Sequence, residues 1–88
     1  MKPIALITGA TSGIGEATAL LLAKNNYNII ITGRRKEKLL LLQEMITAET
    51  NSKVIALNFD IRSLPENEAA IKSLPEDWQN IDVLVNNA

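Results

Sequence analysis

A glycine-rich turn close to the N-terminus constrains the fold of this chain more than any other feature. The turn, Gly9 to Gly15, follows a short apolar run, Ile4 to Ile7, and precedes a helical pattern that runs from Glu16 to Lys24. Backbone N–H groups point outward at the start of a helix, and the helix dipole favours negative charge there. A buried strand, a glycine turn and a helix in this order therefore indicate a site for an anion.

The three glycines of this turn have separate expected roles. Gly9 makes the tight turn, Gly13 lets the backbone approach a phosphate, and Gly15 lets the helix pack closely on the strand. A phosphate loop of the ATPase type needs Lys and then Ser or Thr after its last glycine, and Glu16 stands there instead. The pattern therefore favours nucleotide binding over an ordinary structural turn, and it excludes the ATPase type.

Strand-like and helix-like segments alternate along the chain. Continuous apolar runs predict buried strands at Ile4–Thr8, Asn28–Thr32, Val54–Phe59 and Ile81–Val85. Helical periodicity predicts helices at Glu16–Lys24, Lys36–Glu49 and from Ser63 to about Ser73. Buried strands joined by helices predict an α/β fold with a doubly wound parallel sheet, built as βαβαβαβ with the strand order 3-2-1-4.

Apolar residues at helical spacing are expected to face the sheet. In the first helix these residues are Ile14, Ala17, Leu21 and Leu22, and in the second they are Leu39, Leu42 and Ile46. We expect the first helix to end at the pair Asn25-Asn26. We expect the third helix to begin at Ser63, which has capping-box spacing to Glu66, with Pro65 in the first turn. Two aromatic side chains, Tyr27 and Trp78, are interpreted as packing residues.

The composition excludes several classes of function. The net charge of −1 gives no bulk attraction to nucleic acid or to an anionic membrane. The chain has no cysteine and no histidine, which excludes disulfides, thiolate or imidazole metal sites and histidine acid–base chemistry from this segment. It shows no signal peptide and no apolar run near the roughly 20 residues of a membrane span. We therefore expect a cytoplasmic protein without a nucleic-acid or membrane partner.

Polar groups follow the predicted strands at their carboxyl ends, where ligands of parallel sheets bind. Arg34-Arg35 stand where the fold usually places an acid for the ribose of NAD, and an arginine there accommodates the 2′-phosphate of NADP. A solvated basic turn is the alternative. However, cations at a helix N-terminus oppose its dipole at a cost of ~0.3–1 kcal/mol each. The pair therefore favours NADP.

Two further strand ends keep two interpretations each. Asp60 either caps the turn after its strand or accepts a hydrogen bond from the adenine amino group. Asn86-Asn87 satisfy neighbouring backbone groups and fix the sheet, or contact the adenine ribose, and these two roles are compatible.

These motifs together resemble the short-chain dehydrogenase/reductase family, a family with a Rossmann-type fold. Its glycine motif Thr-Gly-x-x-x-Gly-x-Gly matches Thr8 to Gly15, its Asn-Asn-Ala-Gly motif matches Asn86 to Ala88, and the aspartate after the third strand matches Asp60. Segments 32–35, 60–62 and 73–78 are similar to the NADP-dependent 3-hydroxy acid (serine-type) dehydrogenases.

The resemblance implies an oxidoreductase with NADP as cofactor, which interconverts a hydroxyl and a carbonyl on a small 3-hydroxy acid or a related small-molecule substrate. It also implies a homotetramer in the intact enzyme. The cofactor contacts that it implies are Gly9, Ala10, Thr11, Ser12, Gly13, Ile14, Arg34, Arg35, Asp60, Ile61 and Asn87.

No catalytic residue is assigned within the chain. The family's serine, Tyr-x-x-x-Lys pair and helical asparagine lie beyond the Asn-Asn-Ala-Gly motif, and the fourth residue after Tyr27 is Ile31. We expect residues 1–88 to be the N-terminal cofactor-binding part of a single domain, truncated from a larger chain, inactive alone and exposing an apolar edge strand. A non-catalytic NADP-binding module and an inactive remnant are the alternatives.

Overall fold

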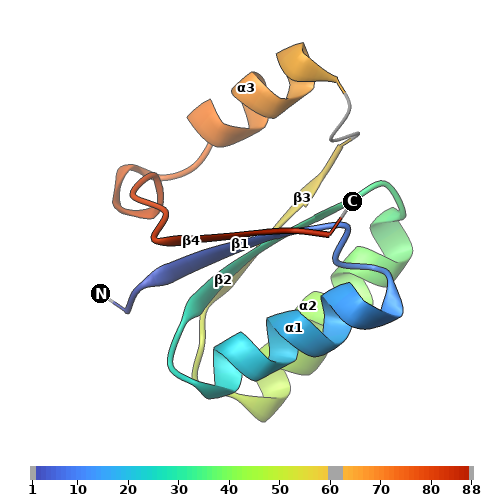
Figure 1. Ribbon diagram of the computed structural model, residues 1–88, viewed down its shortest axis with the longest axis vertical. Helices are drawn as coiled ribbons and strands as arrows, with labels where there is room; N and C mark the ends of the chain where they lie inside the picture. The colour runs from blue at the N-terminus through green and yellow to red at the C-terminus, as the bar shows by residue number, and fades with distance from the viewer. Residues whose placement is uncertain (1, 60–62, 88) are drawn as a thin grey trace.

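Four parallel strands in the order β3-β2-β1-β4 form the centre of the structure (Figure 1). The computed structural model describes residues 2–59 and 63–87. The strands are β1 (Ile4–Thr8), β2 (Asn28–Gly33), β3 (Val54–Asn58) and β4 (Val83–Asn86). The predicted α/β class, the parallel sheet and the strand order are confirmed, and the arrangement is the N-terminal part of a Rossmann-type fold.

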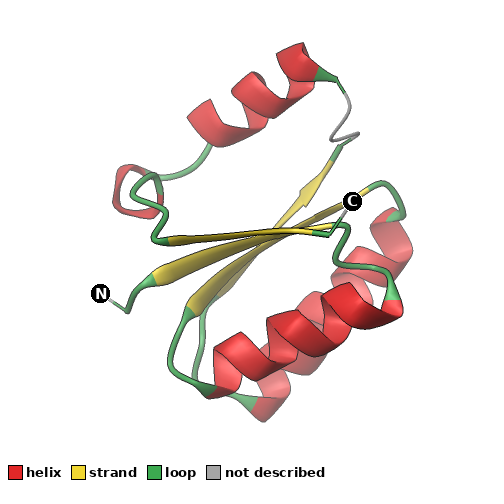
Figure 2. Cartoon of the chain, in the orientation of Figure 1, coloured by secondary structure: helices red, strands yellow, loops and turns green. Residues whose placement is uncertain are grey.

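Helices cover both faces of the sheet (Figure 2). One face carries α1 (Gly13–Lys24) and α2 (Lys36–Glu49), and the other carries α3 (Leu64–Lys72) and a 3₁₀ turn, η1 (Glu76–Trp78). The expected helix ends are confirmed: Asn26 adopts a left-handed φ of 69° after α1, and the Ser63 hydroxyl accepts the N–H of Glu66 at 3.4 Å. Each helix in the described ranges is too short or too polar to span a membrane.

Several boundaries differ from the sequence prediction, and β2 extends one residue further, to Gly33. The first helix begins at Gly13 and not at Glu16, since the Ser12 side chain caps it. The third strand ends at Asn58, one residue before the predicted end. The fourth strand runs Val83–Asn86 and not 81–85, because its pairing with β1 begins at Ala5 opposite Val83. The partner strand, more than the local apolar pattern, sets where β4 begins and ends.

The buried face of α1 was predicted wrongly. Its buried residues are Gly15, Ala19 and Ala23, whereas Ile14 and Leu21 are 73% and 61% exposed and Ala17 is exposed as well. Leu22 is partly buried against the core. The cause is the bulk of the strands: α1 faces a sheet surface that already carries isoleucines, and the remaining space admits only small side chains. A search for large apolar residues at helical spacing overlooks such a face.

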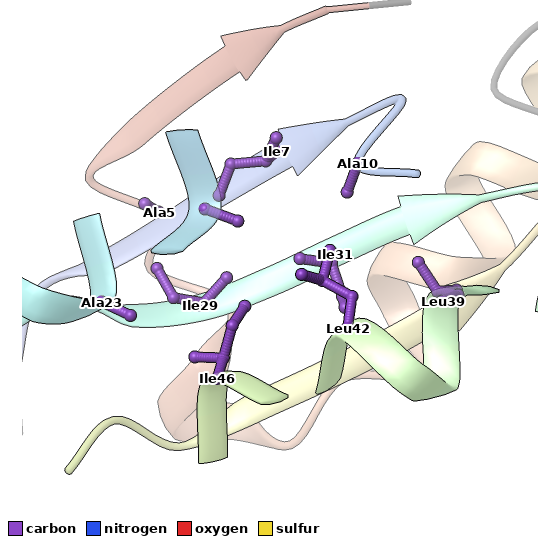
Figure 3. Close-up of a cluster of buried hydrophobic side chains, with 10 residues drawn as sticks. Ala5, Ile7, Ala10, Ala23, Ile29, Ile31, Leu39, Leu42 and Ile46 are labelled. Atoms are coloured by element: carbon purple, nitrogen blue, oxygen red, sulfur yellow. The ribbon is translucent and has the colours of Figure 1, made fainter. Parts of the chain in front are cut away.

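The larger core cluster lies between the sheet and the α1–α2 layer (Figure 3). Ile29 and Ile31 of β2 are fully buried there, and they meet the predicted face of α2, namely Leu39, Leu42 and Ile46. The opposite face of the sheet carries a smaller cluster that includes Ile30 and Trp78. Trp78 is 7% exposed and Tyr27 packs against the larger cluster, so both aromatic residues are packing residues as expected.

β4 is an edge strand within the described part of the sheet. It pairs with β1 on one side, and Leu84 at its centre is 63% exposed. This agrees with the expected exposure of an apolar strand edge.

The small-residue face of α1 is tested by adding volume to it. The Ala19→Leu substitution places a large side chain at a fully buried position against the sheet, and we expect it to lower the free energy of unfolding by ~1–3 kcal/mol. Ala48→Leu, the same change at an exposed position of α2, is the matched control, with an expected effect within ~0.5 kcal/mol. Urea unfolding of the intact protein measures both. Equal effects of the two substitutions would show that α1 does not pack through Ala19.

Candidate functional site

The carboxyl ends of the parallel strands bring together most of the predicted site residues. The glycine loop follows β1, Arg34 and Arg35 follow β2, and Asn87 follows β4, which lies beside β1. Two other predicted site residues, Asp60 and Ile61, lie outside the described residues, as does Ala88 of the family motif. The described part of the site therefore consists of the loop, the end of β2 and the end of β4.

The glycine loop is shaped by its own hydrogen bonds. Gly9 adopts a φ of 60°, the left-handed conformation that favours glycine, so its expected role in the tight turn is confirmed. The Ser12 hydroxyl donates to the Gly9 carbonyl at 3.0 Å and accepts the Gly15 N–H at 3.3 Å. Ser12 thus closes the loop and caps α1 with one side chain.

Asn87 fastens the loop to the end of β4. Its side-chain amide donates to the Gly9 carbonyl at 3.2 Å and to the Ser12 hydroxyl at 2.7 Å, and its backbone N–H donates to the Thr8 hydroxyl at 3.0 Å. Both amide hydrogens thus point into the loop. The structure-fixing role of Asn87 is confirmed, and its contact with a cofactor remains a prediction.

Gly15 and Gly13 differ in what surrounds them. A Cβ on Gly15 would lie 2.4 Å from the Gly9 carbonyl oxygen and 3.0 Å from Asn87 Nδ2, distances too short to accommodate it. A Cβ on Gly13 would meet no atom of the described residues within 4 Å. The close packing expected at Gly15 is therefore present, although it is against the loop and Asn87. Gly13 borders open space at the helix N-terminus, where a ligand can approach the backbone.

The helix N-terminus offers free hydrogen-bond donors beside that space. Gly13 and Ile14 are the first two residues of α1, so their N–H groups have no partner inside the helix. Within the described part of the chain, no acceptor outside the helix takes them either. Two unpaired N–H groups beside an open glycine suit an anion such as a phosphate.

Arg34 and Arg35 extend from a firmly held strand end. The Thr32 carbonyl accepts the Ala10 N–H at 3.0 Å, which joins the loop to β2 just before the arginines. Both arginines are exposed, and Arg35 occupies the N-cap position of α2 without a side-chain cap hydrogen bond. An open depression at the start of α2 is lined by Arg35, Lys36, Glu37 and Lys38. Cations at this position oppose the helix dipole, and an anionic ligand would offset that cost.

Two residues of the site were not predicted from the sequence. The Thr8 hydroxyl accepts the Asn87 N–H, and it lies 3.1 Å from the Asn86 side-chain oxygen. The Asn58 side chain donates to the Gly33 carbonyl at 2.9 Å. Both are polar residues that end an apolar strand, and that position is the sequence signal that could have found them.

The sequence of this chain is similar to the sequences of dehydrogenases. The short chain dehydrogenase family matches residues 3–88. The NADP-dependent 3-hydroxy acid dehydrogenase YdfG of Salmonella typhi is 42% identical over 85 residues, which cover 97% of this chain and 33% of that protein. The serine 3-dehydrogenase of Agrobacterium fabrum is 43% identical over 88 residues, which cover all of this chain and 34% of that protein. The chain thus spans about a third of the length of these relatives.

A solved structure shows the same arrangement. The L-sorbose reductase from Gluconobacter frateurii, complexed with NADPH and L-sorbose, superposes with a TM-score of 0.91 at 29% sequence identity. The match covers 99% of this chain and 33% of that chain.

Two of the three loop glycines, Gly13 and Gly15, are expected to respond in opposite directions to a substitution. Gly15→Ala forces a methyl group against the Gly9 carbonyl, and we expect it to lower the free energy of unfolding by ~1–3 kcal/mol. Gly13→Ala meets open space and replaces glycine by a better helix former, so we expect no loss and a gain of up to ~1 kcal/mol. Urea unfolding of the two variants side by side measures the difference. A loss at Gly13 as large as that at Gly15 contradicts the geometry described here.

Proposed function

The chain belongs to the short-chain dehydrogenase family, and on that premise we propose that residues 1–88 are the N-terminal NADP-binding part of a single Rossmann-type domain. The observation that carries the proposal is the open helix N-terminus at Gly13, with its free N–H groups, next to a strand end that presents Arg34 and Arg35. Both features suit phosphate groups, and they lie at the carboxyl edge of the sheet, where ligands of such folds bind.

The glycine loop would hold the pyrophosphate. Its proposed contacts are Gly9, Ala10, Thr11, Ser12, Gly13 and Ile14. The N–H groups of Gly13 and Ile14 supply hydrogen-bond donors, and the absence of a side chain at Gly13 lets the phosphate come close. Asn87 keeps the loop in this shape, and its side-chain oxygen is left for a contact with the ribose.

Arg34 and Arg35 would bind the 2′-phosphate that distinguishes NADP from NAD. A guanidinium forms two parallel hydrogen bonds to a phosphate and stacks on an aromatic face such as adenine. The name of the Salmonella typhi relative states NADP dependence, and the Gluconobacter frateurii structure contains NADPH. For the adenine amino group we propose Asp60, and for Ile61 we propose the further cofactor contact that the family resemblance implies.

The nicotinamide, when bound, would exchange a hydride with one carbon of a small substrate, and this carbon would thereby interconvert between an alcohol and a carbonyl. This chain's own residues bind and orient the cofactor, and no residue among the 88 is proposed to transfer the proton. A small 3-hydroxy acid is the proposed substrate. The relatives are named for 3-hydroxy acids, serine and sorbose while they share this segment, which supports substrate selection by residues elsewhere in those proteins. For the intact enzyme we propose a cytoplasmic homotetramer.

Removal of both arginines tests the choice of cofactor. In Arg34→Ala/Arg35→Ala we expect the dissociation constant for NADPH to rise roughly 10- to 100-fold, because hydrogen bonds to a charged group contribute ~1.5–3 kcal/mol. NADH binding should stay within about twofold, since NADH lacks the 2′-phosphate. Fluorescence titration of the intact protein measures both.

The charge-matched control is Lys24→Ala/Lys72→Ala, which removes two exposed cations from the last turns of α1 and α3. It should leave both dissociation constants unchanged. Equal affinity of the unmodified protein for NADPH and NADH, or undiminished NADPH binding without the arginines, rejects the assignment.

Gly13→Ala tests the pyrophosphate site separately. A methyl group in the open space at the start of α1 would meet the phosphate, so NADPH and NADH should both bind more weakly, by roughly tenfold or more. The expected loss of affinity is the same for NADPH and NADH, whereas removal of the arginines should weaken NADPH binding alone. Unchanged titration curves for the folded Gly13→Ala protein would place the pyrophosphate elsewhere.

A further inference from the structure

The Gly33 carbonyl at the end of β2 is held by two donors, one from the last residue of β3 and one from the residue that follows it. The Phe59 N–H reaches it at 3.2 Å and the Asn58 side-chain amide at 2.9 Å. Gly33 is the last residue of β2, and Arg34 follows it directly. The two bonds therefore act on the peptide group that leads into the arginines.

Peptide planarity carries this restraint to Arg34. The carbonyl of Gly33 and the N–H of Arg34 belong to one rigid plane, so an oxygen held from two directions also fixes the Arg34 nitrogen and the direction of its Cα. On the opposite side, the Ala10 N–H holds the preceding carbonyl, that of Thr32. The backbone from which the first arginine extends is thus fixed by the loop and by β3 together.

The Asn58 amide is not needed to satisfy the Gly33 carbonyl. The backbone N–H of Phe59 already supplies a donor, and the Asn58 side chain is exposed at the surface. The large energetic cost is that of a buried carbonyl with no hydrogen bond at all. Because the Gly33 carbonyl already has one, a second and exposed donor lowers this cost very little. Its consequence is orientation of the peptide before Arg34.

We propose that Asn58 is a positioning residue for cofactor selectivity, which holds the Gly33–Arg34 peptide so that Arg34 meets the 2′-phosphate. The inference rests on the proposed NADP site. It extends that site to a residue that contacts the backbone of β2 and not the cofactor. Loss of the amide should weaken recognition of the 2′-phosphate and leave the rest of the nucleotide site intact.

The test compares two ligands that differ only in the 2′-phosphate, adenosine 2′,5′-bisphosphate and adenosine 5′-monophosphate. In the intact protein, Asn58→Leu removes the donor and keeps the branched shape of the side chain. Asn80→Leu, the same change at another exposed asparagine, is the matched control. Asn58→Ala gives the same loss without added apolar surface, and it replaces the leucine variant if that variant fails to fold.

We expect the preference for the bisphosphate to fall roughly threefold or more without the amide, the scale of one net hydrogen bond, with unchanged affinity for the monophosphate. The ¹⁵N order parameter of the Arg34 N–H in the ligand-free protein should also fall below the ~0.85 of a rigid backbone. Asn80→Leu should change neither quantity.

Three results would overturn the proposal: an unchanged preference, an equal loss for both ligands, or a lower preference with an unchanged Arg34 order parameter, which would mean direct contact between Asn58 and the phosphate. The unmodified protein separates this proposal from the proposed function. If it binds the two ligands equally, the 2′-phosphate site itself is absent, whereas a clear preference that Asn58→Leu leaves intact rejects only the role of Asn58.

Discussion

The carbonyl oxygen of Gly9 is the point on which the rest of the site depends. It accepts the Ser12 N–H at 3.2 Å, the Ser12 hydroxyl at 3.0 Å and the Asn87 amide at 3.2 Å. These bonds connect the end of β1, the start of α1 and the end of β4. Since the same oxygen lies next to Gly15, a side chain at Gly15 would break the arrangement, whereas the outer side of the loop at Gly13 stays open. One carbonyl thus fixes the shape of the glycine loop, whose open outer side is the proposed phosphate site.

The close approach of α1 to the sheet places the start of this helix, and with it the glycine loop. Gly15, Ala19 and Ala23 form the buried face of the helix, and small residues let its axis lie near β1 and β2. The helix N-terminus then reaches the carboxyl edge of the sheet beside the strand ends that carry Asn87 and Arg34. A bulkier buried face would move that N-terminus away from the partners that shape the loop.

Local features of the site could be predicted from the sequence. The loop is a local motif, so the spacing of Gly9, Gly13 and Gly15 between a strand and a helix was sufficient to place it. The arginines were placed by their position directly after the second predicted strand. The buried face of α1 was not predictable from periodicity, because Ile14 and Leu21 outweigh alanine and glycine in any search for apolar residues. The bond from Asn87 to the Gly9 carbonyl joins residues 78 positions apart. The sequence shows that Gly9 and Asn87 each follow a strand, but it does not show that the two residues are in contact.

The proposal that phosphates bind at the N-terminus of α1 is tested most directly by an NMR titration of the ¹⁵N-labelled intact protein with NADP. We expect the largest chemical-shift changes at the N–H groups of Gly13 and Ile14, with a second group at Arg34 and Arg35. Tyr27, which precedes β2 at the opposite edge of the sheet, should not shift. Binding of NADP without changes at Gly13 and Ile14, or with changes centred on Tyr27, would contradict it.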